Sequence, residues 1–195
     1  KKDINLFKKH INNDCCEIIN EENIISFKKF KDIANKFFKK NNYYKKIQNR
    51  LGWYYQQVLK IAFMIDFVIK RREPILMWDA DAILIKKFVF FESNKTIKYG
   101  TTFEFHRAYF KTNKKILKKL PEYFLAMTNQ FIGLTPFEGK FLVRNFNKIK
   151  KKTRVTSLWV SNIISWAISD AHKNFNGSML SEQELIGHSN LLYSY

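Results

Sequence analysis

Two aspartates at the end of an apolar run constrain this chain more than any other feature. Residues 75–78, Ile-Leu-Met-Trp, have the composition of a short strand buried on both faces. Asp79 and Asp81 follow, and in an extended chain side chains two residues apart point the same way. Two convergent carboxylates are hard ligands of the kind that Mg²⁺ or Mn²⁺ takes together with substrate phosphates. In the alternative interpretation, Asp79 caps a turn and Asp81 lies in solvent.

The composition predicts a folded protein with one domain. Its 195 residues are enough for a single core, so we assign residues 1–195 to one domain. Hydrophobic residues make up 46% and aromatic residues 16%, which excludes a disordered chain. No run reaches the ~18 uncharged apolar residues that a membrane-spanning helix needs. The chain begins at Lys1 and not at Met, which indicates a fragment that lacks its native N-terminus.

The charge is strongly positive, with 35 Lys and Arg against 17 Asp and Glu and a net value of +18. Such an excess suits a nucleic acid, an anionic lipid surface or a phosphorylated substrate. The lysines are scattered among Asn, Ile and Phe, a pattern that is equally typical of a proteome with a biased amino-acid composition. The charge alone therefore does not predict nucleic-acid binding. Cys15 and Cys16 are adjacent and form no spaced pair, which favours a reducing, cytoplasmic setting.

Hydrophobic periodicity predicts the helices. The strongest pattern lies in residues 51–70, where Tyr54, Val58 and Ile61 begin an apolar stripe at helical spacing. Residues 51–81 would form a helix, a short turn and an apolar strand that ends in two aspartates. This order of elements is half of an α/β unit. The other segments with helical spacing are residues 1–13, 23–40, 136–152 and 157–172. Short strands are expected at residues 15–20, 75–78 and 98–105.

Three motifs carry a resemblance to a known family. They are L-G-W-Y-Y-Q-Q-V-L-K at residues 51–60, I-L-M-W-D-A-D at residues 75–81 and S-E-Q-E-L-I-G at residues 181–187. In this order they resemble a bacterial family of proposed glycosyltransferases that is catalogued mainly as a domain of unknown function. That family usually has a threonine where this chain has Ala82. The resemblance implies an α/β, GT-A-like domain with a mixed, mostly parallel sheet flanked by helices.

The resemblance also implies a nucleotide-sugar site. Asp79 and Asp81 would hold the Mn²⁺ or Mg²⁺ that bridges the donor phosphates, with His188 as a further ligand and Asp79 also near the ribose. Lys60 would place its ammonium near the diphosphate. From spacing alone, the same helix positions are also consistent with an ordinary solvated face. The other residues that would line the nucleotide or sugar pocket are Trp53, Gln56 and Gln57.

Two acidic residues near the end of the sequence are candidates for catalysis. Ser181 and Glu184 have the spacing of a capping box, which would start a short helix that ends at Gly187. Glu182 then lies in the first turn, where backbone N–H groups favour its ionised form, and is the candidate general base. Glu184 takes that role if the two are reversed. His106 is a candidate acceptor-side residue, although a lone histidine is more often packed or at the surface.

The residues and the resemblance together predict a metal-dependent glycosyltransferase that moves a sugar from a nucleotide-sugar donor to a glycan or lipid-linked acceptor. The expected setting is surface polysaccharide synthesis on the cytoplasmic side, where the positive charge would favour peripheral contact with the inner face of the membrane. Two alternatives stay open. One is a Mg²⁺-dependent nucleic-acid-processing enzyme with Glu92 as a third carboxylate. The other is a noncatalytic carbohydrate-binding domain of the same fold.

Overall fold

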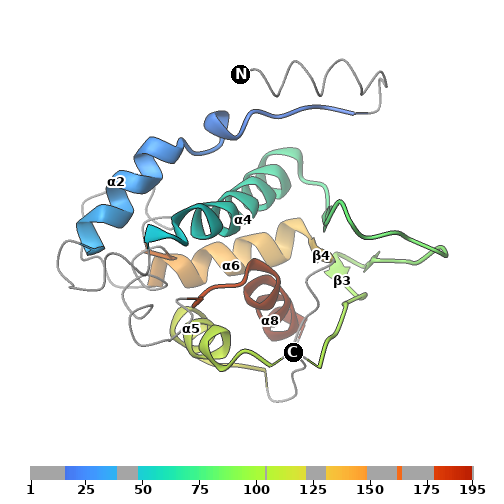
Figure 1. Cartoon of the computed structure of the whole chain (residues 1–195). Coiled ribbons are helices and arrows are strands. Elements are labelled where there is room, and N and C mark those ends of the chain that lie inside the picture. Colours follow the sequence, from blue (N-terminus) through green and yellow to red (C-terminus); the bar gives the residue numbers. More distant parts are fainter. Residues whose placement is uncertain are drawn as a thin grey trace.

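A computed structural model describes residues 16–38, 48–103, 105–121, 131–148, 162–163 and 178–194. In these ranges helices dominate, and two small pairs of strands lie at one side of them (Figure 1). The helices are η1 (Glu21–Asn23), α2 (Phe27–Phe38), α4 (Leu51–Arg71), α5 (Arg107–Leu117), α6 (Pro136–Lys148) and α8 (Glu182–Ser194). The strands are β1 (Ile75–Trp78), β2 (Phe91–Glu92), β3 (Lys95–Thr96) and β4 (Phe131–Leu134).

The central helix is α4, which confirms the helix predicted for residues 51–70. The predicted apolar stripe is buried, and its members Tyr54, Val58, Ile61, Ile65 and Val68 all belong to the core. The helix ends in a left-handed residue, Arg72, whose N–H donates to the Val68 carbonyl at 3.2 Å. Neither α4 nor any other helix in the described ranges combines the length and apolarity that crossing a bilayer requires.

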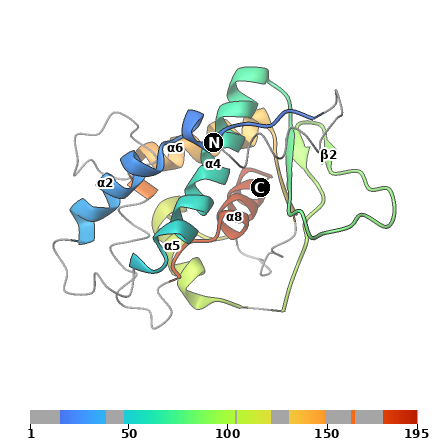
Figure 2. The ribbon, with the colours of Figure 1, turned by 45° about the horizontal axis from the view of Figure 1, so that its top comes forward.

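A glycine lets α6 approach α4 closely. A Cβ atom on Gly139 would lie 2.6 Å from Val68 Cγ2, so a larger residue would require the Val68 side chain or the helices to shift. The two helices share the core with α8, which contacts α5, α6 and β4 (Figures 1 and 2). The helix predicted for residues 136–152 is confirmed as far as Lys148, the last described residue of α6.

The two strand pairs in the described ranges are antiparallel. β1 pairs with β4 in the register Ile75↔Leu134 to Trp78↔Phe131, which confirms the strand predicted at residues 75–78. β2 pairs with β3 through a tight turn whose central residues, Ser93 and Asn94, have φ values of 45° and 63°. A mixed α/β composition is therefore present. The mainly parallel sheet remains a prediction.

The β2–β3 hairpin is fixed to α6 by a buried carboxylate. Glu138 Oε1 accepts the Thr96 N–H and Oε2 accepts the Thr96 hydroxyl, each at 2.7 Å. Oε2 also accepts the Thr135 N–H at 2.8 Å, while the Glu138 N–H donates to Thr135 Oγ1 at 3.3 Å. The last two bonds form a capping box at the start of α6. One side chain therefore begins a helix and holds a hairpin against it.

Six expectations about the secondary structure need correction or lie outside the described ranges. Residues 16–20 and 98–103 contain no strand beyond a single bridge residue at Thr101. α8 does not end at Gly187 but continues to Ser194, because burial against its neighbours outweighs the roughly 1 kcal/mol helix cost of one glycine. The four residues of β1 are half-buried and not fully buried. The predicted helix at residues 1–13 and most of that at residues 157–172 lie outside the described ranges.

The carboxylate of Glu138 can be tested for its stabilising role. Glu138→Ala removes three hydrogen bonds to a charged acceptor, one of which is half of the capping box, so we expect the free energy of unfolding to fall by about 2–4 kcal/mol. Urea unfolding followed by circular dichroism measures the change. Glu92→Ala, on the exposed face of the same hairpin, is the matched control and should cost under about 0.5 kcal/mol. Equal losses of stability in Glu138→Ala and Glu92→Ala would show that the Glu138 carboxylate does not hold the hairpin on α6.

Candidate functional site

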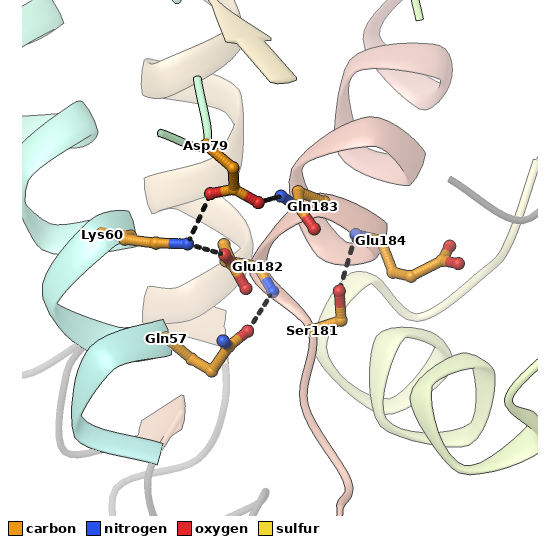
Figure 3. A network of polar contacts seen from close by, with 7 residues as sticks. All are labelled: Gln57, Lys60, Asp79, Ser181, Glu182, Gln183 and Glu184. Atoms are coloured by element: carbon orange, nitrogen blue, oxygen red, sulfur yellow. Dashed lines mark hydrogen bonds and ion pairs between the residues drawn. The ribbon is translucent and has the colours of Figure 1, made fainter. Parts of the chain in front are cut away.

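The predicted motifs meet at one small pocket of about 180 Å³. It lies where the middle of α4, the end of β1 and the start of α8 come together (Figure 3). Its walls contain an ammonium group, two carboxylates, two amides and two aromatic rings. The lining residues are Trp53, Gln57 and Lys60 of α4, Asp79 after β1, Tyr109 of α5, and Ser181, Glu182 and Gln183 at the start of α8.

The Lys60 ammonium lies between two carboxylates. Its Nζ atom is 3.1 Å from Asp79 Oδ1 and 3.0 Å from Glu182 Oε1. Glu182 is only 2% exposed, whereas the side chains of Lys60 and Asp79 are 26% and 27% exposed. The ammonium therefore lies beside the buried carboxylate of Glu182 and the partly exposed carboxylate of Asp79 (Figure 3).

Two side-chain amides hold the residues that carry these carboxylates in place. The Glu182 N–H donates to Gln57 Oε1 at 3.0 Å, which ties the start of α8 to α4. Gln183 Nε2 donates to Asp79 Oδ2 at 3.4 Å, which ties α8 to the end of β1. The glutamine, lysine, aspartate and glutamate of the three motifs are thus joined by contacts between residues that are far apart in the sequence.

The protonation of the pair follows from its surroundings. Burial raises the pKa of Glu182, and the nearby Lys60 ammonium opposes this without cancelling it. For Lys60, burial alone would lower the pKa, but Glu182 and then Asp79 together outweigh burial, so the pKa of Lys60 is raised. Lys60 therefore stays a cation near neutral pH. A carboxylate with a raised pKa in a pocket is a candidate proton acceptor.

Aromatic rings form another wall of the pocket. Trp53 and Tyr109 lie with their ring centroids 6.5 Å apart and their planes 18° from parallel. Arg50 lies over the Trp53 ring at 6.0 Å, and burial raises the pKa of Tyr109. Flat apolar faces beside a few convergent polar groups are typical of small-molecule sites. Tyr109 and Gln183 are site residues that our sequence prediction did not include. Tyr109 lies three residues after His106, and Gln183 lies inside the S-E-Q-E motif.

The chain turns between Asp79 and Asp81 and is not extended there. The Ala82 N–H donates to the Asp79 carbonyl at 3.0 Å and closes a turn, so the extended backbone that the prediction of convergent side chains assumed is absent. Asp79 lines the pocket, whereas Asp81 is exposed and does not. Within the described ranges, no cluster of three or more His, Cys, Asp or Glu residues is arranged to hold a metal ion.

His188 and Glu184 lie together outside the pocket lining. His188 is fully buried, with Nδ1 3.0 Å from Asn113 Nδ2 and Nε2 3.6 Å from Glu184 Oε2. The Glu184 N–H donates to Ser181 Oγ at 3.3 Å, as the capping box predicts. The Glu184 carboxylate, however, points away from Ser181 (Figure 3), because it is directed to the His188 ring one turn along α8.

The remaining predicted site residues, Gln56 and His106, do not line the pocket. Gln56 is exposed on α4, unlike its buried neighbour Gln57, which lines the pocket. His106 is half-buried immediately before α5, and its ring stacks on Tyr109 with the centroids 4.5 Å apart. His106 therefore contacts a lining residue without lining the pocket itself.

Comparison with known proteins identifies a family but no activity. Residues 1–171 match a family of unknown function, DUF6492. This chain belongs to the DUF6492 family. The match includes the α4 and β1 motifs of this DUF6492 chain and stops before α8. Among curated proteins and among solved structures, nothing matches this chain.

The raised pKa of Glu182 makes a prediction about stability. Because this pKa is higher in the folded than in the unfolded chain, the group favours folding at low pH. Its contribution falls as the pH rises from the ordinary glutamate value, about 4.3, through the folded pKa. Glu182→Gln cannot titrate, so we expect it to gain stability over the unmodified protein as the pH rises to neutral. The gain should be about 1.4 kcal/mol for each unit of pKa displacement.

Urea unfolding at several pH values between about 4 and 7 measures this difference. The exposed variant Glu92→Gln is the control, and its difference from the unmodified protein should not change in the same direction. If Glu182→Gln instead becomes less stable than the unmodified protein as the pH rises, then the Lys60 ammonium outweighs burial and the pKa of Glu182 is lowered, not raised.

Proposed function

We propose that this protein is a glycosyltransferase that moves a sugar from a nucleotide-sugar donor to a glycan or lipid-linked acceptor, on a GT-A-like α/β scaffold. One observation supports this above the others. Lys60, Asp79 and Glu182, from three motifs that are separate in the sequence, meet around a single pocket. Ion pairs that only stabilise a fold do not need aromatic walls and an open side.

Each polar group has a role in this proposal. Glu182 accepts the proton of the acceptor hydroxyl, for which its raised pKa and enclosed position are suited. Lys60 remains charged and stabilises the negative charge that develops on the leaving diphosphate. Gln57 holds the backbone of Glu182 through the Glu182 N–H, and Gln183 holds the carboxylate of Asp79. Trp53 and Tyr109 provide apolar faces for a sugar ring.

The size of the pocket suits one sugar. Its volume of about 180 Å³ corresponds to the liquid share of about six water molecules. That is room for a single ring and not for a complete nucleotide-sugar. In this proposal the sugar occupies the pocket and the nucleotide extends toward the surface past the turn that carries Asp81.

A divalent ion, Mn²⁺ or Mg²⁺, is part of the proposal. Such an ion needs only one or two carboxylates when substrate phosphates and water supply its other ligands, and the partly open Asp79 and exposed Asp81 provide these. When bound, the ion would act as a Lewis acid on the leaving diphosphate. His188 is not included, since it is buried against Asn113 and Glu184.

The two alternatives differ in what they need from the pocket. A nucleic-acid-processing enzyme would use Glu92 as a third carboxylate, but Glu92 is exposed on β2 and does not line the pocket. A noncatalytic carbohydrate-binding domain would use the same aromatic walls without turnover. A panel of nucleotide-sugars, screened by thermal shift with Mn²⁺ and then by product formation, separates the three functions.

Asp81 allows a direct test of the metal. Because Asp81 is exposed, Asp81→Asn should leave the fold intact while abolishing the Mn²⁺-dependent part of nucleoside diphosphate binding. Calorimetry with and without EDTA measures this part. The control is Glu92→Gln, which should bind as the unmodified protein does. Unchanged Mn²⁺-dependent affinity in Asp81→Asn would exclude Asp81 as a ligand.

The two glutamates of α8 should separate in their kinetics. With an identified donor and acceptor, Glu182→Gln should keep donor affinity but lower kcat by roughly 10²–10⁴-fold, the range for losing a general base. Glu184→Gln should affect kcat far less, because Glu184 does not line the pocket. The opposite order of effects would transfer the role of base to Glu184. If neither variant lowers kcat, His106 becomes the candidate base.

A further inference from the structure

Exposed apolar side chains are concentrated in one loop. Twelve large apolar side chains are exposed in the described part of the chain, and five of them fall within residues 82–90, which we name the apolar loop. The exposed fractions reach 85% for Ile83 and 90% for Ile85. The other three are Leu84, Phe88 and Val89. An exposed cluster of this kind is typical of a surface that binds a partner or a membrane.

The base of the apolar loop is held firmly. Trp78 Nε1 donates to the Ala82 carbonyl at 2.8 Å, and Phe90 contacts the Trp78 and Phe131 rings with centroids 6.1 and 5.6 Å apart. The Ile97 N–H donates to the Phe90 carbonyl at 2.9 Å. Between these anchors the loop extends away from the helices in both views (Figures 1 and 2).

Lysines are interleaved with the apolar side chains. Lys86 and Lys87 are exposed within the loop itself. Lys98, from the chain after β3, lies with Nζ 4.7 Å from the Phe88 ring centroid, and Lys86 Nζ lies 5.7 Å from the same ring. The lysines and the apolar side chains therefore form one surface.

We propose that the apolar loop docks this protein on an anionic lipid bilayer. Ile83, Leu84 and Ile85 enter the boundary between headgroups and acyl chains, while Lys86 and Lys87 contact anionic headgroups. Insertion removes apolar area from water, and each lysine strengthens binding to an anionic surface by about fivefold. This inference does not depend on the proposed transfer reaction.

The chemistry of the loop favours lipid over two other occupants. A single-stranded nucleic acid would stack its bases on aromatic rings, but the two most exposed side chains of the loop are the aliphatic Ile83 and Ile85. A second copy of this chain would bring a second protein of net charge +18 against the same lysines. An anionic bilayer complements both the charge and the apolar tip.

Docking also has a consequence for the pocket. The apolar loop follows Asp81 directly, and the turn that begins at Asp79 joins it to the pocket. A loop held in the headgroup region would therefore bring the Asp79 wall of the pocket near the membrane surface. If the proposed function is correct, this position favours a lipid-linked acceptor over a soluble glycan.

The test is co-sedimentation of the full chain with vesicles of phosphatidylcholine alone and of phosphatidylcholine mixed with phosphatidylglycerol. We expect binding to the mixed vesicles. Ile83→Ser combined with Ile85→Ser should weaken this binding by at least about tenfold. Lys86→Gln combined with Lys87→Gln should weaken it by about fivefold for each lysine on mixed vesicles, with little change on neutral ones. All four positions are exposed, so the fold should survive, and circular dichroism checks this.

Two matched controls keep the test specific. Ile69→Ser changes an exposed isoleucine on α4, and Lys28→Gln combined with Lys31→Gln removes two exposed lysines of α2. Both should bind mixed vesicles as the unmodified protein does. If the control variants lose as much vesicle binding as the loop variants, binding does not depend on the loop in particular. That result would overturn the proposal and assign binding to the general positive charge of the protein. Absence of vesicle binding would overturn it as well.

Two further outcomes would assign the loop to another partner. Dimerisation that the double isoleucine variant abolishes, measured by analytical ultracentrifugation, would show that the loop binds a second copy. Binding of a single-stranded oligonucleotide that the same variant loses would show a nucleic-acid surface. Nucleoside diphosphate binding is measured separately, so failure of the docking proposal and failure of the proposed function are distinguishable.

Discussion

The site depends on the position of the Lys60 ammonium between Glu182 and Asp79. A carboxylate as enclosed as that of Glu182 is costly unless a cation or hydrogen-bond donors lie beside it. Lys60 supplies the cation at 3.0 Å, and the same ammonium reaches Asp79 at 3.1 Å. One charge therefore joins α4, β1 and α8. The cost of burying Glu182 leaves its pKa raised, which is the property that a proton acceptor in a pocket needs.

Polar contacts fix the helix that carries Glu182. Although α8 is buried over most of its length, several of its buried side chains are polar. Asn190 Nδ2 donates to the Gly133 carbonyl at 2.9 Å, which holds α8 to β4. At its other end, the Glu182 N–H donates to Gln57. Buried hydrogen bonds have narrow geometry, so they define the position of a helix more closely than apolar contacts do.

The pocket and the apolar loop are connected through β1. This strand pairs with β4 and is followed by a turn, with the pocket residue Asp79 at its start and the exposed loop beyond it. Trp78 stacks on Phe131 with centroids 5.3 Å apart, and Phe90 contacts both rings. The pocket and the apolar loop are thus both attached to the paired strands β1 and β4.

The sequence by itself determined the elements whose pattern is local. The apolar stripe of α4 was predictable because a helix repeats every 3.6 residues, and β1 was predictable because a run of four apolar residues is typical of a short strand. It also identified Lys60, Asp79 and Glu182 as candidates. Only the tertiary structure decided that they meet, that Gln57 and not Gln56 faces the pocket, and that His188 lies elsewhere. The contacts of Glu182 with Gln57 and Lys60 join residues more than 100 positions apart. A local sequence pattern does not show which distant helix will pack against a given helix face.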